Sequence, residues 1–185
     1  MGSIKNTIKK ATVLFRQHGG VLRTAEAIRL GIHPRTVYEM RDSGLIEPIS
    51  RGLYRLSSLP PLSAPDLASA SLQVPNGVIC LISALAFHDI TTQIPHEVYI
   101  ALPRGAKRPK IEHPPVRIFW FSGRAFSEGI ENRLIDDIPV RVYCPEKTIA
   151  DCFKYRNKIG LDVAVESLKF YLRLKNKDIN KVMHY

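Results

Sequence analysis

The chain has 185 residues, enough for one large or two small domains, and its 45% hydrophobic and 24% charged content is typical of a globular protein. Its 27 Lys and Arg outnumber 17 Asp and Glu, and the resulting formal charge of +10 favours a polyanionic partner, first nucleic acid and second an anionic membrane surface. The longest apolar stretch, residues 78–87, is about half of the roughly 20 residues needed to cross a bilayer. No apolar signal region follows the N-terminus, so we expect a cytoplasmic protein without membrane segments.

Helical spacing dominates the first 30 residues. Apolar side chains recur every three to four positions between basic ones, which predicts an amphipathic helix ending at Gly19-Gly20. The residues on its apolar face are Ile4, Ile8, Ala11 and Phe15. Thr24 is expected to cap a second, short helix over residues 25–30, which ends at Gly31.

A third helix is predicted from Pro34 to Ser43. Proline suits the first helical position because its missing N–H would have no partner there. Val37 and Met40 fall together on one side of the helical wheel. The opposite side carries Arg35, Tyr38, Glu39 and Asp42. One side is therefore expected to pack while the other stays available to a ligand.

Two short β-prone runs, 45–50 and 53–56, flank Arg51-Gly52 and predict a hairpin with Arg51 at its tip. Three helices, the last two joined by a tight glycine turn and followed by a hairpin, are typical of a winged helix-turn-helix domain. Residues 1–56 hold ten Lys and Arg against four Asp and Glu. We therefore predict that residues 1–56 form a DNA-binding domain.

Residues 57–65 are rich in Pro and Ser and predict a linker, and residues 66–185 a mixed α/β domain. The elements expected there are a helix from Asp66 to Val74, a strand leading into a helix over 78–87, strands 97–102 and 116–121, a hairpin of 130–135 with 140–143 around Asp136-Asp137, and helices from Pro145, over 161–174 and from Asp178. The predicted fold class is thus α/β (α+β), a winged helix-turn-helix followed by a mixed α/β domain.

The third helix supplies the expected DNA contacts. Arg35, Thr36 and Tyr38 lie near its start, where side chains reach base edges in a major groove. Phosphate contacts are expected from Arg23, Thr24 and Arg51, and Arg41 completes the predicted DNA-binding set. The alternative is the solvated polar face of a three-helix bundle. Glu39 could accept from cytosine N4, or Glu39 and Asp42 could both pair with neighbouring arginines, and the residues alone leave this open.

Nothing in the second domain indicates catalysis. Its candidate carboxylates are Asp136, Asp137, Glu146, Asp151, Asp162 and Glu166. Their surroundings fit turns and helix starts, and the chain contains no nucleotide-binding, serine-hydrolase or metalloprotease motif. The three cysteines and six histidines lack the spacing of metal ligands. We therefore expect no enzyme activity, no metal and no cofactor. A basic cluster over residues 104–110 is either a second nucleic-acid contact or a solvated loop.

Three groups of motifs resemble a known family. The winged-helix portion contains G-I-H-P-R-T-V at 31–37, G-L-I at 44–46 and R-G-L-Y at 51–54. Further on stand S-A-L-A-F-H at 83–88 and P-E-K-T-I-A-D at 145–151. In combination, over nearly the whole chain, they resemble the AbiEi-type antitoxins of bacterial type IV toxin-antitoxin systems.

The resemblance implies a protein that represses its own operon, usually on inverted-repeat double-stranded DNA, and a C-terminal domain that counters a nucleotidyltransferase toxin without a stable complex. Lys147 is then either a functional contact or a buried structural residue. Two other functions stay open: a metabolite-responsive repressor with a ligand pocket in the second domain, and a DNA-binding module fused to a nuclease-like domain.

Overall fold

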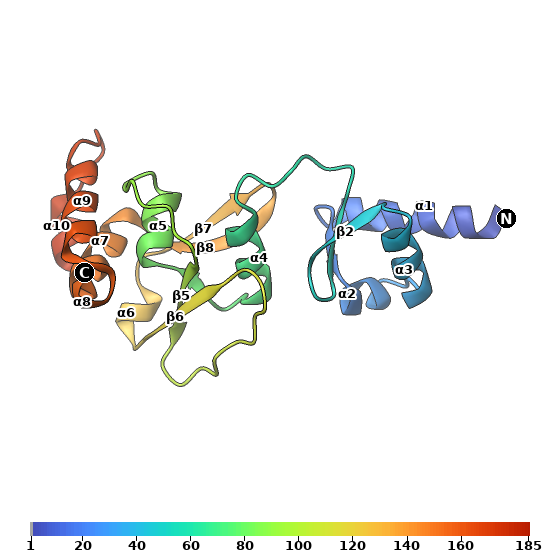
Figure 1. Cartoon of the computed structure of the whole chain (residues 1–185), viewed down its shortest axis with the longest axis horizontal. Helices are drawn as coiled ribbons and strands as arrows, with labels where there is room; N and C mark the ends of the chain where they lie inside the picture. Colours follow the sequence, from blue (N-terminus) through green and yellow to red (C-terminus); the bar gives the residue numbers. More distant parts are fainter. Residues whose placement is uncertain (1) are drawn as a thin grey trace. The chain divides into compact units, whose positions relative to one another are not determined.

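Two compact units make up the chain, Met1–Ser63 and Ala64–Tyr185 (Figure 1). The computed structural model describes the backbone of residues 2–185 and the side chains from Asn6 onward. Met1 and the side chain of Ile4, expected on the apolar face of the first helix, lie outside the described residues. Within this described part of the chain, no helix combines the length and apolar character needed to span a membrane.

The first unit is a winged helix-turn-helix, as predicted. Its elements are α1 (Gly2–Gln17), β1 (Val21–Arg23), α2 (Thr24–Arg29), α3 (Pro34–Asp42), β2 (Ile46–Ser50) and β3 (Leu53–Leu56). The strands form an antiparallel sheet in the order β1-β3-β2. Strand β1 was not predicted from the sequence, because three residues are too few to show an alternating pattern.

A single apolar core holds this unit together. Phe15 of α1 and both Val37 and Met40 of α3 are fully buried, and Leu22 and Leu56 join them from β1 and β3. The predicted inner side of α3 is confirmed, so the rotation of this helix about its own axis is set by packing.

Arg55 attaches the segment that follows the wing to the first unit. Its side chain is buried, and the guanidinium pairs with Glu47 at 3.4 Å. The same group donates to the carbonyl oxygens of Leu59 and Pro60. Because a buried guanidinium needs such partners, the start of the Pro- and Ser-rich segment is held against the sheet.

The second unit is built on a mixed five-stranded sheet in the order β6-β5-β4-β8-β7 (Figure 1). Its elements are α4 (Pro65–Gln73), β4 (Val78–Ile79), α5 (Leu81–Phe87), β5 (Val98–Pro103), β6 (Val116–Phe121), α6 (Arg124–Ser127), β7 (Ile130–Ile135), β8 (Ile138–Tyr143), α7 (Pro145–Lys154), α8 (Arg156–Ile159), α9 (Leu161–Leu172) and α10 (Ile179–His184). The predicted mixed α/β class is confirmed.

Alternation along β5 separates two apolar layers. Tyr99 and Ala101 join the larger core with residues of α5, α7 and α9, whereas Val98 and Ile100 join a smaller core with α4. Since successive strand residues face opposite sides of a sheet, the sheet is buried on both faces. This explains the nearly continuous apolar run of β5.

Several local expectations are corrected. The helix expected from Asp66 to Val74 is α4, which begins one residue earlier, at Pro65, with Ala64 as its N-cap residue. The helices α6 and α8 were not predicted, since four residues show no helical periodicity. The Asp136-Asp137 turn is confirmed: both residues adopt positive φ, which Asp tolerates better than most residues.

Met40→Ala is expected to destabilise the first unit by about 2–5 kcal/mol, because it removes a fully buried side chain and leaves a cavity. Val13→Ala, on the exposed side of α1, should change stability by less than about 0.5 kcal/mol. Urea denaturation followed through amide resonances of residues 20–56 measures both. Equal effects of the two substitutions would contradict the packing assigned to α3.

Candidate nucleic-acid interface

The N-terminus of α3 is held in place by its own first turn. His33 is the N-cap residue, and its Nδ1 accepts a hydrogen bond from the backbone N–H of Arg35 at 3.2 Å. Pro34 occupies the first turn, as predicted. Gly31 adopts a φ of +87° in the turn before it, a conformation that glycine takes without strain. These contacts fix the position and the direction of the first turn of α3.

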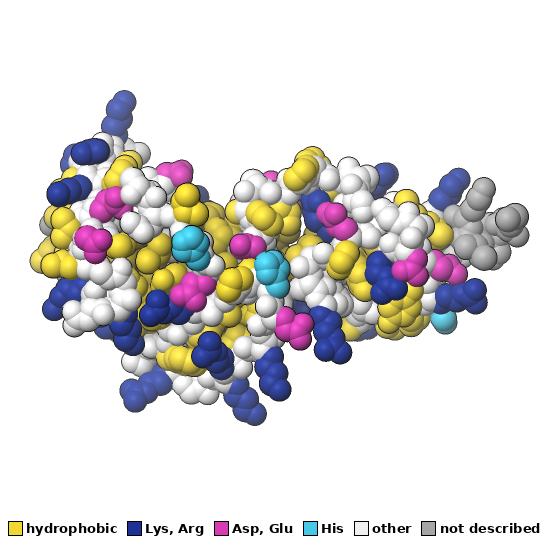
Figure 2. All heavy atoms as spheres, viewed as in Figure 1, with side chains coloured by type: hydrophobic (Ala, Val, Ile, Leu, Met, Phe, Trp, Pro, Cys, Tyr) yellow, Lys and Arg dark blue, Asp and Glu magenta, His cyan; other side chains and the backbone are white. Residues whose placement is uncertain are grey.

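The outer side of α3 carries charges that are paired along the helix. Arg35 Nε lies 3.0 Å from Glu39 Oε1, and the Arg35 side chain is 79% exposed. Arg41 lies 2.8 Å from Asp42 and also sits over the Tyr38 ring, 5.1 Å from its centroid. Basic and acidic side chains accordingly lie next to one another over α3 (Figure 2). In this structure the two acids pair with arginines, one of the two options that the sequence left open.

The predicted position of Thr36 on the outer side of α3 is corrected. It was expected to reach DNA beside Arg35 and Tyr38, but only 5% of it is exposed. Thr36 and the buried Met40 are four residues apart, so both belong to the inner side of the helix. The spacing contained this signal, and it places Thr36 in the support of the helix instead of on its outer surface.

The start of α2 lies against the turn of the wing. The backbone N–H of Thr24 donates to the carbonyl oxygen of Gly52 at 2.8 Å, and its hydroxyl donates to the same oxygen at 3.3 Å. Thr24 is thus the first residue of α2 and not its side-chain cap, which corrects the prediction. Because its hydroxyl proton is already donated, Thr24 is a poor phosphate donor. Exposed Arg23 and Arg51 are brought to the same end of the unit.

Comparison with known families is informative for this first unit. Residues 13–57 match the family model described as transcriptional regulator, AbiEi antitoxin. This segment is therefore similar to AbiEi antitoxins that act as transcriptional regulators. The match spans 45 of the 185 residues and includes α2, α3 and the wing. Comparison of the chain with the curated proteins gave no match.

The match confirms the AbiEi resemblance on the part of the chain that carries the winged helix. The matching family is one of transcriptional regulators, and within the matched segment the outer side of α3 is exposed.

The two motifs of the second unit that resemble AbiEi proteins meet in the fold. His88, at the end of the S-A-L-A-F-H segment, lies with Nε2 2.7 Å from the carbonyl oxygen of Tyr143. Thr148 of P-E-K-T-I-A-D donates from its hydroxyl to Cys144 O at 2.9 Å. Burial lowers the pKa of His88. Thr148 Oγ1 also lies 3.2 Å from the same Tyr143 oxygen, so both motifs bind the end of β8, and α5 lies against α7.

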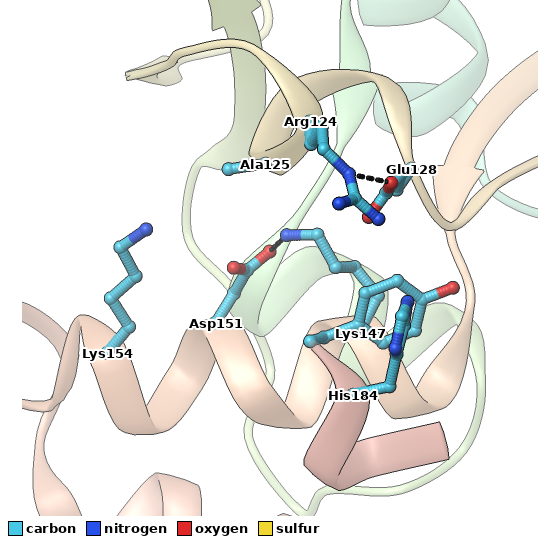
Figure 3. A pocket seen from close by; sticks show the side chains of 8 residues that line it. Arg124, Ala125, Glu128, Lys147, Asp151, Lys154 and His184 are labelled. Atoms are coloured by element: carbon cyan, nitrogen blue, oxygen red, sulfur yellow. Dashed lines mark hydrogen bonds and ion pairs between the residues drawn. The ribbon is translucent and has the colours of Figure 1, made fainter.

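Of the two roles considered for Lys147, a functional contact or a buried structural residue, the structure shows the buried one. The residue is 2% exposed and forms an ion pair with Asp151, one turn further along α7 (Figure 3). Its ammonium also lies over the rings of Tyr143 and Phe121, 4.7 and 5.1 Å from their centroids. Burial raises the pKa of Asp151, although Lys147 acts in the opposite direction. This pair was not predicted from the sequence, although Lys147 and Asp151 have the i, i+4 spacing of helix neighbours.

Lys147→Met should destabilise the second unit by about 3–5 kcal/mol, because Asp151 would remain buried without a partner. The double variant Lys147→Met, Asp151→Leu should recover most of that loss, since neither charge is then buried. Thermal and urea unfolding of the unchanged protein, of Lys147→Met and Asp151→Leu alone, and of the double variant measure the coupling. Additive effects of the two substitutions would show that the pair contributes no mutual stabilisation.

Proposed function

We propose that the chain represses transcription of its own operon by inserting α3 into the major groove of an inverted-repeat operator. The observation that carries the proposal is the outer row of Arg35, Tyr38 and Arg41 on a helix fixed by buried Val37 and Met40. The family match supports a transcriptional regulator. A major groove admits one α-helix of this kind.

Arg35 is assigned to base recognition. Its Nε donates to Glu39 Oε1 at 3.0 Å, and the two terminal nitrogens of the guanidinium make no hydrogen bond within the described part of the chain. Two parallel N–H groups match the O6 and N7 acceptors of guanine. Glu39 thus orients the arginine and reduces the rotamer freedom that binding would otherwise remove.

Arg23 and Arg51 are assigned to phosphates on the duplex backbone, and Arg41 to a phosphate or base next to Tyr38. Arg51 lies in the turn of the wing and Arg23 directly before α2, so neither residue belongs to α3. Phosphate contacts release counterions, and affinity should therefore fall steeply as salt rises. Thr24 and Thr36 are left out of this interface.

Arg35→Ala is expected to weaken binding to the operator by about 1–3 kcal/mol and to relax base choice at one position. Arg35→Lys should lose most of the same discrimination, because lysine keeps the charge but not the paired donors. Arg29→Ala, an exposed residue at the end of α2, is the matched control. Fluorescence anisotropy with operator and random duplexes at several salt concentrations measures all four proteins. If Arg35→Ala weakened both duplexes equally, Arg35 would be a phosphate contact and the base readout would be refuted.

The second unit is proposed to counter a nucleotidyltransferase toxin without forming a stable complex with it. The support is the meeting of the two AbiEi-like motifs around α7 and the separation of the chain into two compact units. A unit with its own core can act independently of DNA binding.

Co-expression with a nucleotidyltransferase encoded next to this chain tests the second role. The Arg35→Ala variant should repress a promoter reporter less strongly but still protect cells from the toxin. Lys147→Met should do the reverse, because it weakens only the second unit. Loss of protection in Arg35→Ala at equal protein level would show that the two roles are inseparable, and co-purification of the two proteins would contradict the absence of a stable complex.

A further inference from the structure

The loop between β5 and β6 carries four exposed positive charges. The two strands are parallel, so their connection must cross from one end of the sheet to the other, and Figure 1 shows this yellow-green segment running out from the sheet. Residues 104–113 contain four Lys and Arg and one Glu. The basic side chains make no hydrogen bond or ion pair within the described part of the chain. They are Arg104, Lys107, Arg108 and Lys110.

This loop is attached to the sheet at its start and in its middle. The backbone N–H of Arg104 donates to Phe121 O at 2.7 Å, and the indole Nε1 of Trp120 donates to Ala106 O at 3.1 Å. Ala106 and Ile111 pack against the smaller core of the unit. These two apolar residues therefore face inward and fix the course of the loop, and the basic residues are left facing solvent.

Trp120 offers an aromatic surface beside these charges. It lies on the edge strand β6 and is 43% exposed, whereas its two neighbours in the strand are buried in the larger core on the other face of the sheet. Its N–H is already donated to Ala106, so what it presents to a ligand is ring surface. Lys107 follows Ala106 directly, and Lys110 lies at most about 14 Å further along the chain. A ligand of a few nucleotides can therefore span the ring and the basic side chains.

We propose that residues 104–110 and Trp120 bind single-stranded nucleic acid, in addition to the duplex that α3 is proposed to read. Proteins bind single strands by combining cationic side chains, which follow the phosphates, with aromatic side chains on which bases stack. A duplex fits this surface less well, because the faces of its bases are covered by their neighbours in the stack. An anionic membrane also fits less well, since insertion needs outward apolar side chains and this loop turns Ala106 and Ile111 inward.

The test uses the single tryptophan of the chain as its reporter. The full chain is titrated with oligothymidylate and with oligouridylate of about eight nucleotides, a usual site size for single strands. Both should change the Trp120 emission in a saturable way, because a stacked base alters the surroundings of the indole. The response should weaken as salt rises, since phosphate contacts release counterions. Tighter binding of oligouridylate would identify RNA as the ligand, and tighter binding of oligothymidylate single-stranded DNA.

The double variant Lys107→Gln, Lys110→Gln should weaken single-strand binding about tenfold or more, because two charge-assisted contacts are lost. Lys175→Gln, Lys177→Gln is the matched control, since it removes two exposed lysines between α9 and α10 and changes the net charge equally. Its affinity should match that of the unchanged protein. Trp120→Leu, followed with a labelled oligonucleotide, should weaken binding about fivefold or more through the loss of stacking. Circular dichroism checks that each variant is folded.

The proposal would be overturned if single strands left the emission unchanged, or if the two lysine variants lost affinity equally. An equal emission response to a duplex of random sequence, or to phosphatidylserine vesicles, would also contradict it.

Operator affinity separates this result from the proposed function. It should be unchanged in Lys107→Gln, Lys110→Gln, because operator recognition is assigned to the first unit. Arg35→Ala should lower operator affinity and leave the emission response to single strands as it is. A loss of operator affinity in the loop variant would place duplex DNA on the loop and refute a single-strand site.

Discussion

Burial of Val37 and Met40 is the constraint on which the presentation of α3 depends. The two residues are one turn apart, and their contacts with α1 and the sheet allow one rotation of the helix. In that rotation Arg35, Tyr38 and Arg41 point outward. A groove-reading helix needs this fixed geometry, because an arginine that could rotate with its helix would lose orientation entropy on binding and discriminate bases poorly.

Two polar attachments in the first unit limit how far α2, the wing and the segment after β3 can move relative to one another. Thr24 binds the carbonyl oxygen of Gly52 twice, so the start of α2 and the wing turn move together. Further along β3, buried Arg55 holds the segment that follows this strand. A small domain has few apolar residues to spare, and such polar attachments add specificity where core area is limited.

Much of the first unit could be predicted from its sequence because its signals are local. Pro34 at a helix start, glycines at the turns and the 3.6-residue spacing of Val37 and Met40 each belong to one short segment. Thr36 was placed on the outer side of α3 because it follows Arg35 in the sequence. Its i, i+4 relation to Met40 predicts burial instead. Strand β1 and helices α6 and α8 escaped prediction for another reason: three or four residues are stabilised by tertiary contacts and not by a periodic pattern.

In the second unit, a sequence motif is weaker evidence for a functional contact than for a buried structural role. In P-E-K-T-I-A-D a lysine and an aspartate suggest chemistry, yet both side chains are buried and satisfy each other among aromatic rings. Removal from water makes such a pair costly to break but gives it little net stabilising energy, so its main effect is to specify one arrangement of α7. The exposed Arg124 and Lys154 carry no motif signal of their own, and only the three-dimensional arrangement shows that both line one pocket. In this unit, sequence indicates the buried framework, and the three-dimensional arrangement is needed to find the surface that it supports.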